Sequence, residues 1–107
     1  MQLTTRVALA GATDTAVFLA QRPQLFRDAR GRALGSVAFG GLWLALAATS
    51  AVQQPRPGTA TVTLAGTVAA ANAVMLTVHL RHGIANPRVF AGAALSAVAL
   101  ADVLRRR

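Results

Sequence analysis

Few side chains in this chain could do acid–base chemistry, and the acidic ones are Asp14, Asp28 and Asp102. Asp14 lies near the middle of an apolar stretch, where a charge within lipid costs at least ~2.5–3.5 kcal/mol. An aspartate in that position indicates a proton or cation site, or a contact with a ligand. The alternative, which we favour, is structural: Asp14 is protonated, as burial in lipid favours, or it hydrogen-bonds a neighbouring helix.

Asn72 is the obvious partner for Asp14, because it lies near the middle of another apolar stretch. Together the two residues form a candidate intramembrane polar site. We expect them to lie at similar depth and to face the interior of a helical bundle. An asparagine within lipid gains roughly 0.6–2 kcal/mol from a hydrogen bond to another helix. Helix packing therefore explains Asn72 more simply than ligand binding does.

The remaining candidates have local explanations. Arg105 and Arg106 follow Asp102 at positions i+3 and i+4, a spacing that predicts an ion pair on one helix. His79 and His82 could face one way and bind a metal or haem, but no third ligand lies near them in sequence. We therefore predict no metal and no cofactor. The chain has no cysteine, no phosphate-binding glycine loop and no HExxH or GxSxG motif, so we predict that it is not an enzyme.

The composition is typical of a membrane protein. Hydrophobic residues make up 54% of the 107 residues and charged residues 13%, against about 25% charged residues in soluble domains. The net charge of +8 raises the alternative of nucleic-acid binding, but every basic residue is an arginine and most lie at the ends of apolar blocks. No aromatic residues alternate with them as a stacking platform requires. We predict no nucleic-acid partner. Arginine without lysine, beside abundant alanine, suggests a bacterial source.

Prolines at positions 23, 55, 57 and 87 interrupt the chain between its apolar blocks. They divide a single domain, residues 1–107, into four segments: 4–20, 33–52, 59–80 and 88–104. A helix needs roughly 20 residues to cross a bilayer, which the second and third segments satisfy. The first and fourth are shorter and each contains an aspartate. We read the first as a retained helix rather than a signal peptide, because Asp14 interrupts it.

These segments predict an all-α, up-down bundle of four transmembrane helices, with three spans as the alternative. The connections are short, and Gly83 is expected to end the third helix. Pairs of small residues four apart favour close helix packing: Ser36 and Gly40, Gly66 and Ala70, Gly92 and Ser96. The arginines are nearly balanced between the two sides, so orientation is open. We favour a cytoplasmic location for the first and third loops, and insertion in both orientations is the alternative.

The layout also resembles a known group of proteins. The phrase RPQLF follows the first segment, DARGRALG enters the second, and the third ends in VHLRHG. This succession is similar to small four-helix bacterial membrane proteins of the DoxX-like group and related families of unknown function. The resemblance implies a four-helix bundle. It carries no catalytic residues across to this chain.

The sequence thus favours a small multi-pass protein of the cell membrane, the inner membrane if the source is bacterial. We predict a non-enzymatic subunit, scaffold or accessory factor that acts by helix packing. Its partners would be the lipid bilayer and a second copy or a larger membrane complex. The alternative is a small transporter or channel that uses Asp14 as an intramembrane proton or cation site. That alternative predicts a polar cavity converging on Asp14, with Asn72 and Thr67 beside it.

The four-span topology can be tested with reporter fusions after residues 28, 56, 84 and 107. We expect the reporters to alternate in location along this series, because each added segment crosses the bilayer once. Enzymatic reporters active on only one side of the membrane provide the measurement. Fusions after residues 28 and 56 that report the same side would remove the second span and contradict the model.

Overall fold

A computed structural model describes residues 2–53 and 56–107 of the chain. Its elements are α1 (Leu3–Gln21), α2 (Leu25–Asp28), α3 (Arg30–Val52), α4 (Thr59–Arg81) and α5 (Pro87–Arg106). The described residues contain no strand, so the all-α prediction is confirmed. Each of the four apolar segments falls within one long helix. Pro55, which we used to mark the second connection, lies outside the described residues.

The helices begin and end at residues with clear local reasons. Pro23 follows the C-cap of α1, and a proline cannot continue the hydrogen bonding of a helix. At the end of α4, Gly83 has a positive φ of 69°, its N–H donates to Leu80, and the N–H of Ile84 donates to His79. This pattern is a Schellman motif, which confirms Gly83 as the terminating residue. The N-cap of α5 is Asn86, whose side chain accepts a hydrogen bond from the backbone N–H of Arg88.

The start of α4 is capped by a side chain from the end of α3. Gly58 occupies the N-cap position and has no side chain to accept a hydrogen bond. The amide oxygen of Gln53 takes this role, accepting from the backbone of Gly58 at 3.0 Å and from the hydroxyl of Thr61 at 2.7 Å. A Cβ at position 58 would lie 2.7 Å from the same oxygen, so a larger residue there would displace the Gln53 side chain from this cap. Gln53 thereby ties α3 to α4.

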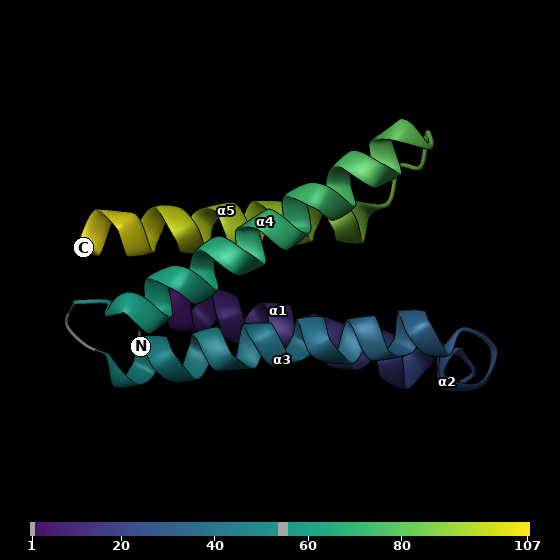
Figure 1. The fold of residues 1–107 in the computed structure, drawn as a ribbon, viewed down its shortest axis with the longest axis horizontal. Coiled ribbons are helices and arrows are strands. Elements are labelled where there is room, and N and C mark those ends of the chain that lie inside the picture. Colours follow the sequence, from purple (N-terminus) through teal and green to yellow (C-terminus); the bar gives the residue numbers. More distant parts are fainter. Residues whose placement is uncertain (1, 54–55) are drawn as a thin grey trace.

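Neighbouring long helices run antiparallel, and each packs against two others. α1 and α4 both contact α3 and α5. The two termini and the α3–α4 connection share one end of the molecule, and α2 and the α4–α5 turn lie towards the other (Figure 1). The register between α1 and α3 is fixed by contacts of Thr5 with Ser50 and of Thr15 with Gly40.

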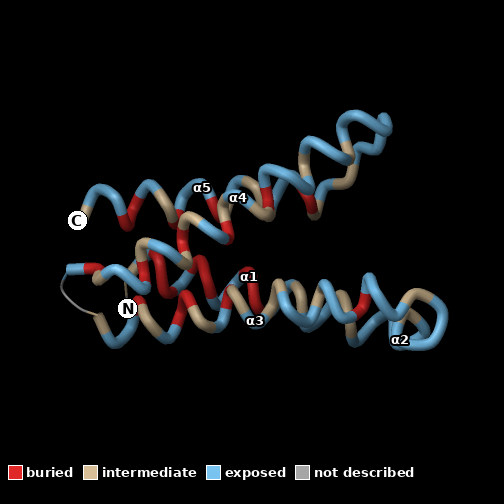
Figure 2. Tube along the Cα trace, in the orientation of Figure 1, coloured by how far each residue is buried: buried red, intermediate tan, exposed pale blue. Residues whose placement is uncertain are grey.

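The core is concentrated at the end that holds the termini (Figure 2). Its hydrophobic cluster comprises Val7, Ala8, Ala12, Trp43, Leu46, Ala47, Ala65, Val68, Ala99 and Val103. Towards the opposite end, α4 diverges from α1 and α3 (Figure 1), and the buried residues of α4 stop at Asn72. The second half of α4 is therefore largely exposed. The four long helices pack together at one end, and towards the other end α4 leaves α1 and α3 (Figure 1).

The largest side chain in the core, Trp43, is 1% exposed. It packs against the backbone of α1 at Gly11, where an added Cβ would overlap the indole ring. Phe39 meets the ring edge-on, with centroids 6.1 Å apart. Trp43 therefore packs between helices and does not face lipid.

Three of the helices are long and apolar enough to cross a membrane: α3, α4 and α5. α1 has 19 residues, which is a sufficient length, but it is less apolar than these three helices and is not among the candidate spans. Arg6 and Asp14 are its charged residues, and four threonines make it more polar still. The structure thus supports three candidate spans directly, and the case for the fourth rests on how α1 packs.

The Gly11–Trp43 contact predicts a position-specific effect of adding one methyl group. Gly11→Ala should destabilise the fold by about 1–3 kcal/mol, because the buried ring must move. Gly41→Ala is the matched control: it also replaces a helical glycine, but its Cβ would meet nothing within 4 Å, so a gain of up to about 1 kcal/mol is expected. Thermal unfolding in one detergent measures both. Equal melting temperatures for the two variants would contradict the proposed contact.

Candidate functional site

The structure does not bring Asp14 and Asn72 together. Asp14 is on α1 and its side chain is 59% exposed, whereas Asn72 is on α4 and is 3% exposed. The expectation that Asp14 faces the interior is therefore wrong, and the expectation for Asn72 is confirmed. Asp14 points outwards because the inner face of α1 is occupied by small residues such as Gly11 and Ala12, which pack closely against other helices.

Asp14 is engaged by an arginine from α5. The Nη2 group of Arg88 donates to the carboxylate of Asp14 at 3.0 Å and to its backbone oxygen at 2.8 Å. The two residues are 74 positions apart in the sequence. Asp14 thus contacts a neighbouring helix, one of the structural roles considered for it, but it does so through an ion pair on the outer surface.

An aromatic ring organises the surroundings of this ion pair. The guanidinium carbon of Arg88 lies 4.5 Å from the centroid of the Phe18 ring, and that of Arg22 lies 4.6 Å from it. Both distances are typical of cation–π interactions. We call Asp14, Phe18, Arg22 and Arg88 the Phe18 clamp. A sequence signal was present but missed: Asp14 and Phe18 are four residues apart and share one face of α1, and Arg22, the C-cap residue, follows four positions later.

Asn72 serves close packing between α4 and α5. Its amide nitrogen donates to the backbone oxygen of Val68 on its own helix, at 2.9 Å. Its amide oxygen faces Gly92 of α5, where a Cβ would lie only 2.7 Å away. The expected hydrogen bond to another helix is not formed among the described residues. Asn72 instead fills the space that Gly92 leaves open, so it is a packing residue.

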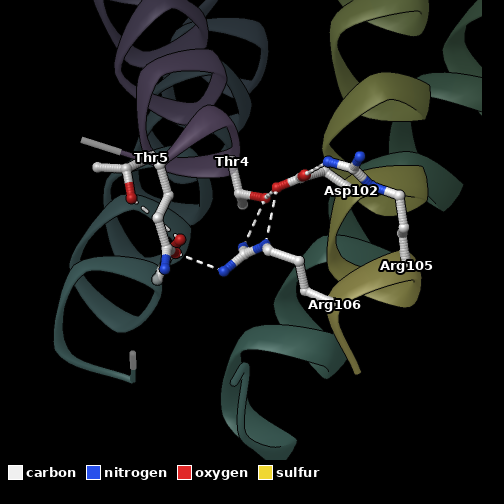
Figure 3. Close-up of polar contacts among 7 residues, drawn as sticks. Thr4, Thr5, Asp102, Arg105 and Arg106 are labelled. Atoms are coloured by element: carbon white, nitrogen blue, oxygen red, sulfur yellow. Dashed lines mark hydrogen bonds and ion pairs between the residues drawn. The ribbon is translucent and has the colours of Figure 1, made fainter. Parts of the chain in front are cut away.

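A second polar group lies where the termini meet, and its central residue is Asp102. The side chain of Asp102 is 3% exposed and pairs with Arg105 at 2.8 Å and with Arg106 at 3.0 Å. The predicted ion pairs at i+3 and i+4 are therefore confirmed. Thr4 of α1 adds a hydrogen bond, donating from its hydroxyl to Asp102 at 2.6 Å. The ion pairs stay within α5, and Thr4 extends the group to α1 (Figure 3).

Arg106 completes this group, which we call the terminal polar cluster: Gln2, Thr4, Asp102, Arg105 and Arg106. Its guanidinium donates to the hydroxyl of Thr4 at 3.1 Å and to the amide oxygen of Gln2. Beside it, the hydroxyl of Thr5 donates to Ser50 of α3 at 3.0 Å. Among the described residues, no buried side-chain nitrogen or oxygen lacks a hydrogen-bond partner. The polar side chains at this end join α1 to both of its neighbours.

Both histidines lie at the end of α4 that is remote from the termini. The Nδ1 atom of His79 lies 2.8 Å from the backbone oxygen of Met75, one turn earlier on α4. His82 is the exposed C-cap residue of that helix. Within the described ranges, no group of three His, Cys, Asp or Glu residues comes close enough to hold a metal ion.

Two shallow hollows follow the exposed surface of α4. Both are lined by Val74 and Val78, and one also by Thr67 and Ala70. Neither is lined by Asp14 or Asn72. The hydroxyl of Thr67 donates to the backbone of Thr63 at 2.8 Å rather than to a neighbouring helix. The three residues that a transporter was expected to gather around one cavity therefore lie apart.

No protein-family model, curated protein or solved structure matches this chain. The resemblance to the DoxX-like group is not tested by these comparisons and stays a prediction. The two polar groups, the Phe18 clamp and the terminal polar cluster, are therefore the basis for any functional assignment.

The terminal polar cluster predicts a graded response to truncation. Asp102→Ala should destabilise the fold by about 3–5 kcal/mol, because it leaves the largely buried Arg106 without its counter-charge. Arg105→Ala is the control within the cluster: its side chain is 74% exposed, so about 1 kcal/mol or less is expected. Chemical unfolding in detergent gives both values. If Arg105→Ala lowers the free energy of unfolding as much as Asp102→Ala does, the burial of a side chain does not determine its contribution to the stability of the cluster.

Proposed function

We propose that this chain is a multi-pass integral membrane protein, an up-down bundle in which α1, α3, α4 and α5 all cross the bilayer. The length and apolar composition of three of these helices support the proposal. The charge distribution along α5 supports it further. Arg88 lies at the start of that helix and Asp102 near its end, and residues 89–101 between them carry no charge. At ~1.5 Å per residue, this apolar stretch is roughly 20 Å long.

α1 is the fourth span in this proposal, and its packing reduces the cost of its polar residues. The hydroxyls of Thr4 and Thr5 are hydrogen-bonded to α5 and α3. Thr15 satisfies its hydroxyl by donating to the backbone of Gly11 at 3.0 Å. Asp14 is neutralised by Arg88. A helix whose polar groups already have partners enters lipid at lower cost than its composition alone indicates.

The proposed role is that of a non-enzymatic subunit, scaffold or accessory factor that acts by helix packing. The observation that carries this proposal is the Asp14–Arg88 ion pair: the carboxylate and the backbone oxygen of Asp14 are both engaged by the Arg88 guanidinium, so the pair joins α1 to α5. Asp102 is occupied in the same way by Arg105 and Arg106. Two of the three acids in the chain are therefore engaged in structural ion pairs: Asp14 joins α1 to α5, and Asp102 pairs with arginines of its own helix.

Large apolar side chains on the outer surface support an environment of lipid and other helices. Examples at least half exposed are Leu34, Leu44, Val74 and Leu80, on α3 and α4. The proposed partners are thus the lipid bilayer and either a second copy of the chain or a larger membrane complex. The proposed location is a cell membrane, the bacterial inner membrane if the compositional argument about the source holds.

The substitution Asp14→Asn separates the proposed role from a transporter. We expect the purified variant to lose about 1 kcal/mol of stability or less, because the ion pair is exposed. Wild type and variant should both leave the proton and cation permeability of liposomes at the level of empty vesicles. Thermal unfolding and ion-flux assays on the same preparations measure the two effects. A wild-type flux that a stable Asp14→Asn protein has lost would overturn the proposed role and favour transport.

A further inference from the structure

The arginines of the Phe18 clamp have hydrogen-bond donors to spare. Arg88 makes both of its contacts with Asp14 through Nη2, although a guanidinium carries five N–H donors. Among the residues described, its Nε and Nη1 groups make no hydrogen bond, and neither does the side chain of Arg22. Both guanidinium groups contact the ring of Phe18, at 4.6 Å for Arg22 and 4.5 Å for Arg88. The distance between the two guanidinium carbons therefore cannot exceed the sum of these two values.

The clamp also lies in a strongly basic region. Arginines gather where α1, α2, α3, α4 and α5 begin or end on this side of the molecule: Arg22, Arg27, Arg30, Arg32, Arg81 and Arg88. The acids of the region are Asp14 and Asp28, so a positive charge remains after pairing. An anion that approaches this end meets a favourable potential.

We propose that Arg22 and Arg88 bind the phosphate group of an anionic phospholipid, with Phe18 fixing the geometry of both side chains. Guanidinium groups bind phosphate oxygens through paired N–H donors, and this planar fork is the reason that arginine recurs in phosphate sites. Asp14 orients Arg88 by holding one of its terminal nitrogens, which leaves the other donors directed elsewhere. The inference rests on the proposed membrane location.

The apolar surroundings distinguish a phospholipid from a free phosphate ion. Phe26 of α2 is 45% exposed, and Leu34 and Val37 of α3 are 55% and 47% exposed. The register of α1 with α3, set by Thr15 and Gly40, places Leu34 and Val37 level with the last turns of α1. A ligand that carries both a phosphate and acyl chains matches charged donors and exposed apolar side chains at the same level of the molecule. Phospholipid headgroups at this level would also give the exposed Asp14–Arg88 pair a polar environment.

The test measures which phospholipids remain bound to the purified protein. The wild type and its variants are reconstituted into vesicles of equal parts phosphatidylcholine and phosphatidylglycerol, extracted with a mild detergent, and analysed by native mass spectrometry. We expect the wild type to retain phosphatidylglycerol in preference to phosphatidylcholine. Arg22→Gln should lower that preference about ten-fold, because one charge-assisted contact is lost. This variant leaves the Asp14–Arg88 pair intact, so its fold is not at risk from losing that pair.

Two further variants control for charge and for folding. The double change Arg56→Gln and Arg107→Gln removes two positive charges from the opposite end and should leave the preference unchanged. Phe18→Leu keeps every charge but removes the ring and should weaken phosphatidylglycerol retention, since the guanidinium groups are no longer fixed. Circular dichroism confirms that each variant remains helical.

Three results would overturn the inference: no preference in the wild type, no loss in Arg22→Gln, or an equal loss in the control double variant. Stabilisation by inorganic phosphate without a preference for phosphatidylglycerol would also overturn it, because the phosphate would then be recognised without its lipid. Failure of the underlying membrane location has a separate signature. Alkaline carbonate would then release the wild-type protein from membranes, irrespective of lipid charge.

Discussion

A carboxylate buried among helices needs partners for its negative charge and its hydrogen-bond acceptors, and the side chains that supply them to Asp102 come from both ends of the chain. Arg105 and Arg106 supply charge from its own helix, and Thr4 supplies a hydroxyl from α1. Because Thr4 and Asp102 are 98 positions apart, this one group closes the ring of helices. With α1 held against α5, Trp43 can settle on Gly11, and the hydrophobic cluster forms beside the same end.

Small residues determine how closely the helices approach, and they do so unevenly. The indole ring of Trp43 packs against Gly11, the side chain of Thr15 against Gly40, and the side chain of Asn72 against Gly92. Gly35 and Gly66 meet nothing within 4 Å at the position of a Cβ. The small-residue spacing in the sequence thus marks real contacts at Gly40 and Gly92 but leaves Gly66 on an open surface. Close packing and polar bonding coincide at one end, and the opposite end is held by the Phe18 clamp.

The sequence predicted what depends on local rules. Pro23 and Gly83 marked the ends of α1 and α4, and the spacing of Asp102 with Arg105 and Arg106 predicted their ion pairs. The start of α3 at Arg30 rather than at residue 33, and the short helix α2, were not predicted. The sequence also did not predict which way Asp14 points. The polar residues of α1 do not form one continuous stripe that would reveal its inner face, so its rotation is set by contacts such as that of Gly11 with Trp43. The Asp14–Arg88 pair joins residues of different helices, 74 positions apart, so no local spacing predicts it.

The divergence of α4 from α1 and α3 gives the molecule the outline of a wedge (Figure 1). For a chain inserted in a bilayer, the spread end occupies more area in its leaflet than the packed end does in the other. Such a shape is accommodated most easily where the leaflet around the wide end is the convex one. The tapering cross-section of the helices, rather than any single residue, would then set how such a chain fits a curved bilayer.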